Sequence, residues 1–325
     1  MRRVLVTGGL GFIGANLVDR MISMGEVTVL DDQSSGRLNS VQQHADNPKF
    51  RFVDGSVLDP VKIDEAMQNA DAVVHLAAVV SVNRSLEDPY LVHKTNVEGT
   101  LNVLESCLRH SVEKMIFISS AAVYGNHRGT PLSEETRSDP SNLYGATKAA
   151  GEAYVNAFHE TDGLETVILR MMNVYGPGRS PGPYAGVITQ FAQAVSEGKP
   201  LLIFGDGEQT RDFVYISDVI DSILGALESP RAIGNTLNIG TGIASSVNQL
   251  ARVFSKLSQP ELPIQHLPPR TGDVKRSCAD IEKARKILSY NPKVLLEKGI
   301  ESYMQWFRLN YENFLREIDA LKIST

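Results

Sequence analysis

Short runs of consecutive apolar residues alternate with longer segments of helical spacing in the first half of the chain. Five runs are strand-like and bounded by Gly, Asp or Ser, at 3–7, 27–31, 50–53, 72–76 and 115–119. Runs of this length suit strands that are covered on both faces, as in a parallel sheet. The intervening segments have the spacing of amphipathic helices. The alternation predicts a doubly wound α/β fold with a parallel sheet.

The pattern changes after about residue 169. Proline and glycine crowd into residues 177–183, which is typical of a loop and interrupts the alternation. A helix is expected over 186–197, and the strand-like run at 236–239 could return to the first sheet. This later part is expected to be a smaller domain built on the first.

Length and composition agree with this division. A chain of 325 residues suggests two domains or one large one. We expect the doubly wound domain over residues 1–170, with a returning segment near 213–240, and a smaller α/β domain mainly over 171–325. Hydrophobic residues make up 42% and charged residues 22%, which excludes a disordered or collagenous chain.

Charge and cysteine usage narrow the class further. The formal net charge of −6 argues against a nucleic-acid partner, which needs a basic face. Two distant cysteines, Cys107 and Cys278, fit a reducing compartment, although one long-range bridge is possible. No run reaches the roughly 20 apolar residues that span a bilayer. We expect a cytoplasmic protein without membrane contact, and the seven histidines show no metal-ligand spacing.

A glycine-rich turn follows the first strand and opens a helix. Gly8, Gly11 and Gly14 let the backbone turn tightly, approach a pyrophosphate and pack helix on strand. The helix N-terminus offers N–H groups to the anion. Asp31 ends the second strand 23 residues after Gly8, near the expected spacing of about 20. Its carboxylate suits a ribose diol and repels a 2′-phosphate, so NAD is favoured over NADP. Residues 1–170 are therefore expected to form an NAD-binding Rossmann domain.

Three polar residues form the candidate catalytic set. Tyr144 and Lys148 are four apart in a helical pattern, so they share a face. Taken alone, this spacing is common and indicates a solvated pair. Ser120 follows the fifth strand, at the sheet edge where ligands of open parallel sheets bind, and its alternative role is to cap the next turn.

The chain resembles the extended short-chain dehydrogenase/reductases, in their nucleotide-sugar epimerase and dehydratase branch, from residue 4 to about residue 292. The markers are the glycine turn, Asp31, His75-Leu76-Ala77-Ala78, Asn96, Ser120, Tyr144 with Lys148, Asn173 to Pro177, Gly205 to Asp212 and Arg270 to Asp273. The resemblance implies that Tyr144 is the general base toward a sugar hydroxyl. Lys148 would help to lower its pKa from about 10, and Ser120 would bond the same sugar oxygen.

The resemblance also implies a set of cofactor contacts. The residues expected to bind NAD are Gly8, Gly11, Phe12, Ile13, Gly14, Asp31, Asp32, Ser35, Gly36, Ser56, Val57, Leu76, Ala77, Ala78, Asn96, Tyr144 and Lys148. His75 is expected to shape the cofactor turn. One position departs from the family: Gly55 is followed by Ser56 where an Asp usually bonds the adenine, and Asp54 or Asp59 could compensate.

The reaction follows from what accompanies the catalytic hydroxyl. Family dehydratases carry an Asp-Glu pair after it and decarboxylases a Glu, whereas this chain has Ala121 and Ala122. The resemblance therefore implies a 4-epimerase that passes through a transient 4-keto sugar. Dehydration by unfamiliar groups, reduction of a keto-sugar, and a non-catalytic NAD-sensing protein remain as alternatives.

The resemblance further implies a UDP-sugar substrate and a homodimer. Residues expected on the substrate are Ser120, Asn173, Val187, Phe204, Arg211, Arg270, Asp273 and Ser277, with the arginines on the diphosphate. The small Ser277 would admit a 2-acetamido group, so UDP-N-acetylglucosamine is expected beside UDP-glucose. The stripe of Val97, Leu101, Leu104 and Leu108, and the face of Ala149, Ala153 and Ala157, are expected to be core first. In the family the two corresponding helices pair across a dimer axis.

Overall fold

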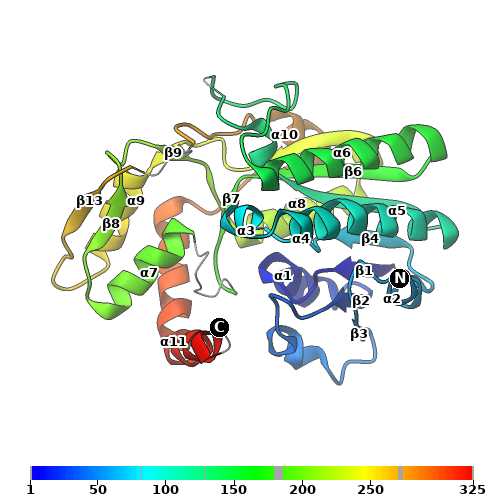
Figure 1. The fold of residues 1–325 in the computed structure, drawn as a ribbon, viewed down its shortest axis with the longest axis horizontal. Coiled ribbons are helices and arrows are strands. Elements are labelled where there is room, and N and C mark those ends of the chain that lie inside the picture. Colours follow the sequence, from blue (N-terminus) through cyan, green and yellow to red (C-terminus); the bar gives the residue numbers. More distant parts are fainter. Residues whose placement is uncertain (1, 81, 128, 179–185, 270–273, 324–325) are drawn as a thin grey trace.

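A seven-stranded parallel sheet forms the centre of the larger part of the molecule (Figure 1). The structure is a computed structural model that describes residues 2–80, 82–127, 129–178, 186–269 and 274–323. The strands, in order across the sheet, are β11 (Asn235–Ile239), β6 (Glu165–Met171), β5 (Lys114–Ser120), β4 (Ala72–His75), β1 (Arg3–Thr7), β2 (Glu26–Asp31) and β3 (Phe50–Asp54). Each pairs in parallel with its neighbours. The predicted doubly wound fold is confirmed, and the run at 236–239 belongs to β11.

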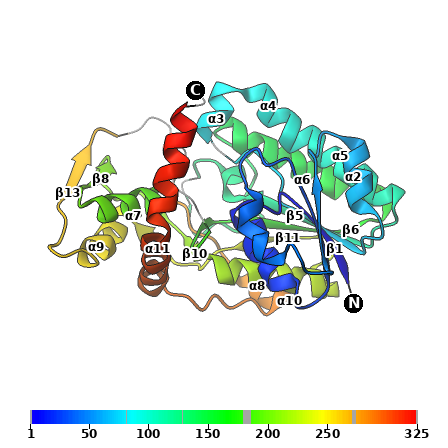
Figure 2. The same cartoon turned by 90° about the horizontal axis from the view of Figure 1, so that it is seen from below.

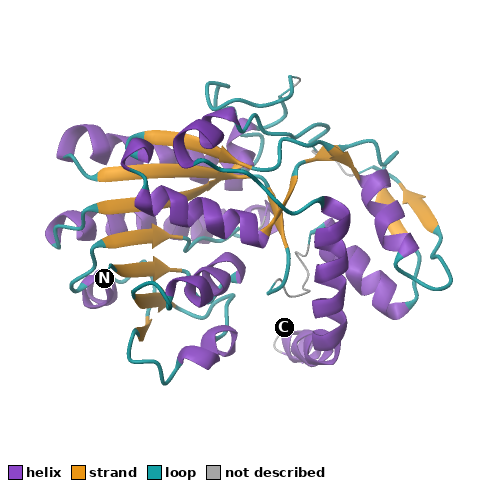
Figure 3. Cartoon of the chain, turned by 180° about the vertical axis from the view of Figure 1, so that it is seen from behind, coloured by secondary structure: helices purple, strands orange, loops and turns teal. Residues whose placement is uncertain are grey.

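Helices cover both faces of this sheet (Figure 3). One layer consists of α1 (Phe12–Met21), α8 (Ile216–Glu228) and α10 (Glu282–Leu288), and the other of α2 (Pro60–Met67), α5 (Gly99–Arg109) and α6 (Leu143–Asp162). Along β1, Val4 and Val6 join the core on one face and Leu5 joins the core on the other. Strand side chains alternate between faces, so burial on both explains why these runs are apolar at consecutive positions.

The strand order reverses between β1 and β4. The chain runs outward from β1 through β2 to β3, then returns to β4 and continues the other way through β5 and β6. Ligands of open α/β sheets bind at the carboxyl ends of the strands beside such a reversal. The remaining short elements are α3 (Val82–Glu87), α4 (Pro89–His93), a π-helical turn (Lys94–Glu98) and the 3₁₀ turns Leu38–His44, Ala121–Tyr124 and Pro230–Ala232.

The smaller part of the molecule (Figure 2) has a hydrophobic core of its own. It is surrounded by α7 (Val187–Glu197), α9 (Val247–Lys256), α11 (Leu296–Ile323), β8 (Leu201–Phe204) and β13 (Ile264–Leu267). Two short two-stranded sheets lie nearby. In one, β7 (Asn173–Tyr175) pairs in parallel with β10 (Phe213–Tyr215), and in the other, β9 (Thr210–Arg211) pairs antiparallel with β12 (Ser245–Ser246). The domain division at residue 170 stays a prediction. None of the described helices is long and apolar enough to cross a bilayer.

The expected core faces of two helices need a correction. Ala153 and Ala157 of α6 are exposed, and Leu108 of α5 is 37% exposed. The face of α6 toward the sheet carries Gly151 instead, where a Cβ would lie 2.6 Å from the Phe117 ring. Both segments are helical, as their apolar spacing predicts, but part of the apolar face of each helix points outward.

Candidate active site

The turn between β1 and α1 depends on close backbone contacts. Gly8 has a φ of +70°, and a Cβ there would lie 2.7 Å from the backbone N of Ala77. A Cβ on Gly14 would lie 2.4 Å from the Gly8 carbonyl oxygen. Gly11 is the N-cap of α1 and has no side chain to cover the first N–H groups, including that of Ile13. The turn therefore fits a pyrophosphate.

The loop after β2 lies against the same turn. Asp31 is 9% exposed; its Oδ2 accepts from Leu10 N (3.0 Å) and its Oδ1 from Gln33 N (2.8 Å). Burial raises the pKa of this carboxyl, against the effect of both backbone hydrogen bonds. Asp32 Oδ1 accepts from Ser34 N (3.0 Å), and a Cβ on Gly36 would lie 2.5 Å from the Leu10 carbonyl carbon. Asp31 and Gly36 thus border the glycine turn. Contacts of Asp31, Asp32, Ser35 and Gly36 with a cofactor stay predictions.

A buried histidine holds the turn that follows β4. His75 Nδ1 lies 2.7 Å from Thr7 Oγ1, and His75 Nε2 lies 3.0 Å from Thr100 Oγ1. Because the Thr100 hydroxyl donates to Asn96 O (2.7 Å), it accepts from His75, which places the ring hydrogen on Nε2. Burial lowers the pKa of His75 to about 3, so the ring is neutral. Thr7 Oγ1 also accepts from Ala77 N (3.3 Å), which ties residues 76–78 to the end of β1.

Asn96 links this turn to α6. It lies in the π-helical turn, accepts from Val79 N (2.8 Å) and donates to Val79 O (3.1 Å) and Thr147 Oγ1 (2.9 Å). Thr147 in turn donates to Tyr144 O (2.8 Å). The amide of Asn96 therefore clamps protein groups on both sides. Its contact with a cofactor stays a prediction.

Helix α6 carries Tyr144 and Lys148 one turn apart. Lys148 is 3% exposed, and its Nζ donates to Ile118 O of β5 (2.7 Å). Burial lowers the pKa of Lys148 to about 8, and the charge of Glu152 acts in the opposite direction. Tyr144 is 9% exposed. The ammonium is therefore held between α6 and β5, on the helix turn that follows the phenol.

Ser120 ends β5 beside the start of α6. Its Oγ accepts from Ala122 N (3.2 Å), so it caps the 3₁₀ turn Ala121–Tyr124. A Cβ on Gly145 would lie 2.5 Å from Ala122 O, which shows that this turn and the start of α6 are in contact. The structure thus brings Ser120 into the same small region as Tyr144 and Lys148. The side chains of Ala121 and Ala122 beside it are methyl groups and cannot transfer protons.

The loop after β3 carries Ser56 and Val57, two residues expected to contact the cofactor. Ser56 Oγ accepts from Leu58 N (3.3 Å), and Val57 O accepts from Asn102 Nδ2 (3.0 Å). Asp59 caps α2 by accepting from Val61 N and Lys62 N. This carboxylate is engaged as a helix cap, so how the loop binds adenine stays a prediction.

The expected substrate residues come from several elements. Asn173 is exposed on β7, Val187 begins α7 and Phe204 ends β8. Arg211 Nη1 donates to Thr210 O (2.8 Å) and Val274 O (2.6 Å). Ser277 is 9% exposed, and its N donates to Thr210 O (3.2 Å), so it lies beside the strand that carries Arg211. Arg270 and Asp273 lie outside the described residues.

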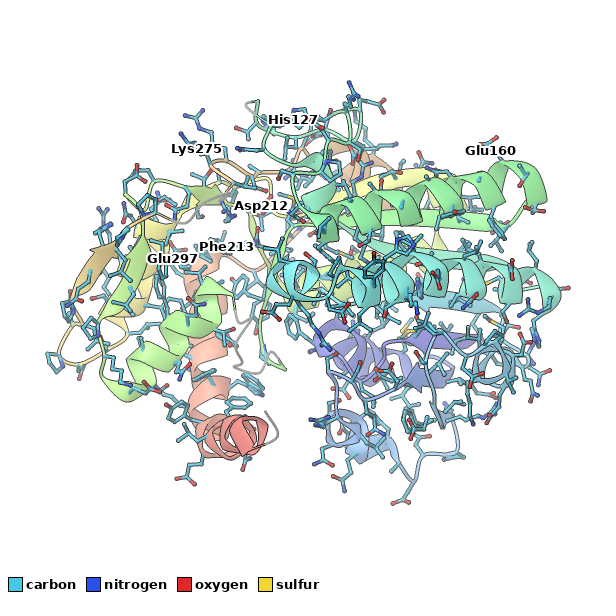
Figure 4. All side chains as sticks on the ribbon, in the orientation of Figure 1. His127, Glu160, Asp212, Phe213, Lys275 and Glu297 are labelled. Atoms are coloured by element: carbon cyan, nitrogen blue, oxygen red, sulfur yellow. The ribbon has the colours of Figure 1, made fainter. Side chains whose placement is uncertain are left out.

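The buried carboxylate of Asp212 holds together the segments around Arg211 and Ser277. This role was not predicted from the sequence. Asp212 is fully buried and accepts from Thr241 N and Oγ1, from Gly242 N and from Ala279 N. Figure 4 shows it at the junction between the large sheet and the smaller part, beside Phe213. Burial raises the pKa of Asp212, and the four hydrogen bonds oppose that shift. The motif Gly205 to Asp212 is visible in the sequence. A local pattern does not show the hydrogen bonds of Asp212 with Thr241 and Ala279, which lie 29 and 67 residues farther along the chain.

Comparison with known proteins places this geometry in a family. Residues 4–240 match the NAD dependent epimerase/dehydratase family. The UDP-glucose 4-epimerase of Mycolicibacterium smegmatis is 37% identical over 310 residues, covering 94% of this chain and 98% of that one. The crystal structure of UDP-glucose 4-epimerase from Thermotoga maritima with UDP-glucose has a TM-score of 0.90 at 36% identity and covers 95% and 99%.

Other similar proteins differ in the substrate or the reaction that their names give. The UDP-N-acetylglucosamine 4-epimerase from Methanobrevibacter ruminantium, in complex with UDP-N-acetylmuramic acid, has a TM-score of 0.90 at 33% identity, covering 94% and 98%. Enzymes named as a decarboxylase and as a dehydratase are also 33% identical. The chain belongs to the NAD-dependent epimerase/dehydratase family, and its cofactor is NAD.

Proposed function

We propose that the protein inverts carbon 4 of a UDP-hexose. The observation that carries this proposal is the grouping of Ser120, Tyr144 and Lys148 beside Ala121 and Ala122. The group contains a base, a cation and a hydroxyl, but no carboxylate follows the hydroxyl. Dehydration requires an acid and a base for loss of water, and these alanines supply neither. Proton transfer at one alcohol is the chemistry that remains.

The cofactor-binding residues are proposed from the same geometry. The N–H groups at the start of α1 would hold the pyrophosphate, and Asp31 a ribose diol. Residues 76–78, fixed by His75 and Thr7, would border the nicotinamide half. Bound NAD supplies an acceptor and then a donor of hydride for carbon 4.

The chain's own residues handle the proton. Tyr144 takes the proton from the C4 hydroxyl and returns it after the sugar has turned over. A free phenol has a pKa near 10, so a shift to about 7 requires roughly 4 kcal/mol of differential stabilisation. The Lys148 ammonium lies on the next helix turn, in a buried setting where its charge acts strongly. Ser120 bonds the same sugar oxygen and orients it.

The nucleotide is held while the sugar rotates. Arg211, with Arg270, is proposed on the diphosphate, and Asn173 on the phosphate or sugar. Val187 and Phe204 are proposed to line the uracil pocket, and Asp273 to complete the substrate site. The epimerase of known structure with UDP-glucose supports the class of ligand.

Outward apolar side chains on α5 and α6 support a homodimer. Leu108 is 37% exposed and Tyr154 is 40% exposed, and Ala153 and Ala157 are exposed as well. We propose that these helices pair with a second copy. Light scattering after gel filtration should give twice the chain mass.

The test is to incubate the purified protein with separate UDP-sugars and to resolve C4 epimers by proton NMR. UDP-glucose should yield UDP-galactose, and the Tyr144→Phe variant should lose at least 10²-fold in kcat, as expected for loss of a general base. NAD should remain with the protein through gel filtration. Formation of a 4-keto-6-deoxy sugar or of a pentose would contradict the proposal.

Ser277 is proposed to set the tolerance for a 2-acetamido group. It lies beside β9, and a serine side chain is small enough to admit a 2-acetamido group if Ser277 borders the sugar as proposed. Ser277→Tyr should reduce turnover of UDP-N-acetylglucosamine at least tenfold while leaving UDP-glucose within about twofold. An equal loss on both sugars would remove this assignment.

A further inference from the structure

A buried ionic cluster lies directly behind Lys148. Glu152 is one turn farther along α6 and accepts from Ser119 Oγ (2.5 Å). Arg170 of β6 donates from Nη2 to Glu152 Oε2 (2.7 Å) and from Nε to Oε1 (2.9 Å). Ser119, Glu152 and Arg170 are 2%, 6% and 7% exposed. The proton chemistry proposed above assigns no role to these three residues.

The cluster holds α6 against β5 at a second point. Lys148 bonds the carbonyl of Ile118, and Glu152 bonds the hydroxyl of the next residue, Ser119. The strand then ends at Ser120. Ser119 and Arg170 are register partners across β5 and β6, so both approach Glu152 from adjacent strands. Two consecutive strand residues thus grip two consecutive turns of the helix.

Stability alone does not account for such a pair. Replacing a buried ion pair by well-packed apolar residues is often neutral or stabilising, so an ion pair here points to another use. The remaining Arg170 nitrogen, Nη1, donates to Tyr124 OH (3.0 Å) and to Glu134 O (3.2 Å). Burial would lower the pKa of Arg170, but the hydrogen bonds and charge of Glu152 outweigh it and raise the value. The guanidinium is therefore a permanent charge.

We propose that Ser119, Glu152 and Arg170 are positioning residues: they fix the register of α6 on β5 and place a paired carboxylate behind Lys148, which sets how Lys148 and Tyr144 face Ser120. This inference rests on the proposed proton transfer at Tyr144. It goes beyond it because these three residues act through α6 and touch neither sugar nor cofactor in that scheme.

The charged groups around Lys148 determine in which direction its pKa should change when the cluster is altered. Glu152 and Tyr144 lie one turn to either side on α6, Arg170 stands behind Glu152 on β6, and neutral His75 faces from β4. The Phe117 ring centroid lies 4.9 Å from Lys148 Nζ. Glu152 is the anion that favours the protonated amine. Removing its charge while Arg170 stays positive must make Lys148 lose its proton at lower pH.

The first arm of the test follows Lys148 itself. The NAD-bound protein is labelled with [¹³Cε]lysine, and the Lys148 signal is assigned by its loss in Lys148→Arg. In Glu152→Gln the titration midpoint should fall by roughly one pH unit. Lys114→Gln is the matched control, because Lys114 is a buried cation at the other end of β5 and bonds Leu227 O (3.2 Å). It should leave the midpoint unchanged.

The second arm tests register without changing charge. Ser119→Ala keeps both ions and removes one hydrogen bond, so kcat should fall about tenfold with KM within twofold, as expected for misplacement of reacting groups. The Lys148 midpoint should stay in place. If Glu152→Gln fails to fold, Ser119→Ala decides alone.

Two results overturn the inference: an unchanged Lys148 midpoint in folded Glu152→Gln, or full kcat in Ser119→Ala. The titration needs no substrate. If no UDP-sugar is epimerised, the proposed function fails while the lysine arm still decides whether the cluster controls Lys148.

Discussion

The tautomer of His75 is determined by its two hydrogen-bond partners. Its two ring nitrogens bond Thr7 and Thr100, and the ring packs at 5.9 Å from that of Phe117. The neutral ring satisfies both hydroxyls, one as acceptor and one as donor. A protonated ring would donate from both nitrogens and would be buried with a charge. Burial accordingly lowers its pKa to about 3.

This shift predicts how stability depends on pH. In the unfolded chain the His75 ring has a pKa of about 6.5 and binds a proton below that pH, whereas in the folded protein it stays neutral. The free energy of unfolding therefore decreases as pH falls. Between pH 7.5 and pH 5 the wild-type protein should lose about 1–2 kcal/mol from this group. Urea unfolding should show that His75→Gln lacks this loss, although it is less stable at pH 7.5. The exposed His266→Gln should follow the wild type; an equal pH dependence in all three contradicts the assignment.

Among the secondary-structure elements, β1, β4 and α1 meet at the glycine turn, where their backbones come into close contact. The approach of Gly14 to Gly8 O leaves no room for a methyl group. Gly225, within α8, differs because a Cβ there would meet Leu288 at 3.7 Å, an ordinary contact. Substitution by alanine is therefore expected to destabilise the protein at Gly14 but not at Gly225.

Gly14→Ala should cost at least 2 kcal/mol, since backbone atoms must move, and should release NAD during gel filtration. Gly225→Ala should be neutral or stabilise by up to about 1 kcal/mol, because alanine is the better helix former. Thermal unfolding and the absorbance of retained cofactor measure both. A Gly14→Ala protein that keeps its NAD and its melting temperature would show that the turn is looser than the structure indicates.

Elements with a strong local pattern were predictable from the sequence. The strands around β1 to β5 have apolar runs that end at polar residues, and the glycine turn has its own spacing. The contacts of Glu152 with Ser119, 33 residues away, and of Asn96 with Val79 and Thr147 were not predictable. They depend on strand register and on the π-helical turn, which short-range spacing does not encode. The prediction that Ala153 and Ala157 of α6 belong to the core was wrong for the same reason. Periodicity shows which residues share a helix face, but it does not show whether another element packs against that face.

In the molecule as a whole, the buried Asp212 lies at the junction between the large sheet and the smaller part (Figure 4). Asp212 follows Arg211 and binds the backbone at 241–242 and 279, and its own carbonyl accepts from Asn173 N (2.9 Å). Residue 279 follows Ser277 closely in the chain. Asp212 is thus connected, through its carboxylate and its backbone, to the segments that carry Arg211, Asn173 and Ser277, which are proposed to hold the substrate.

Asp212→Asn tests this role, because it keeps the volume but turns one acceptor into a donor facing backbone N–H groups. An unsatisfied buried donor costs about 1–3 kcal/mol, so the melting temperature should fall by several degrees. KM for the UDP-sugar should rise at least tenfold, as Arg211 and Ser277 lose their support, whereas retention of NAD on the distant glycine turn should not change. Asp218→Asn, which removes a buried carboxylate that binds Lys293 N (3.0 Å) and Val294 N (3.1 Å), is the matched control and should lower stability without raising KM. If both variants raise KM equally, the effect is general loosening of the fold, and Asp212 has no special part in holding the substrate residues.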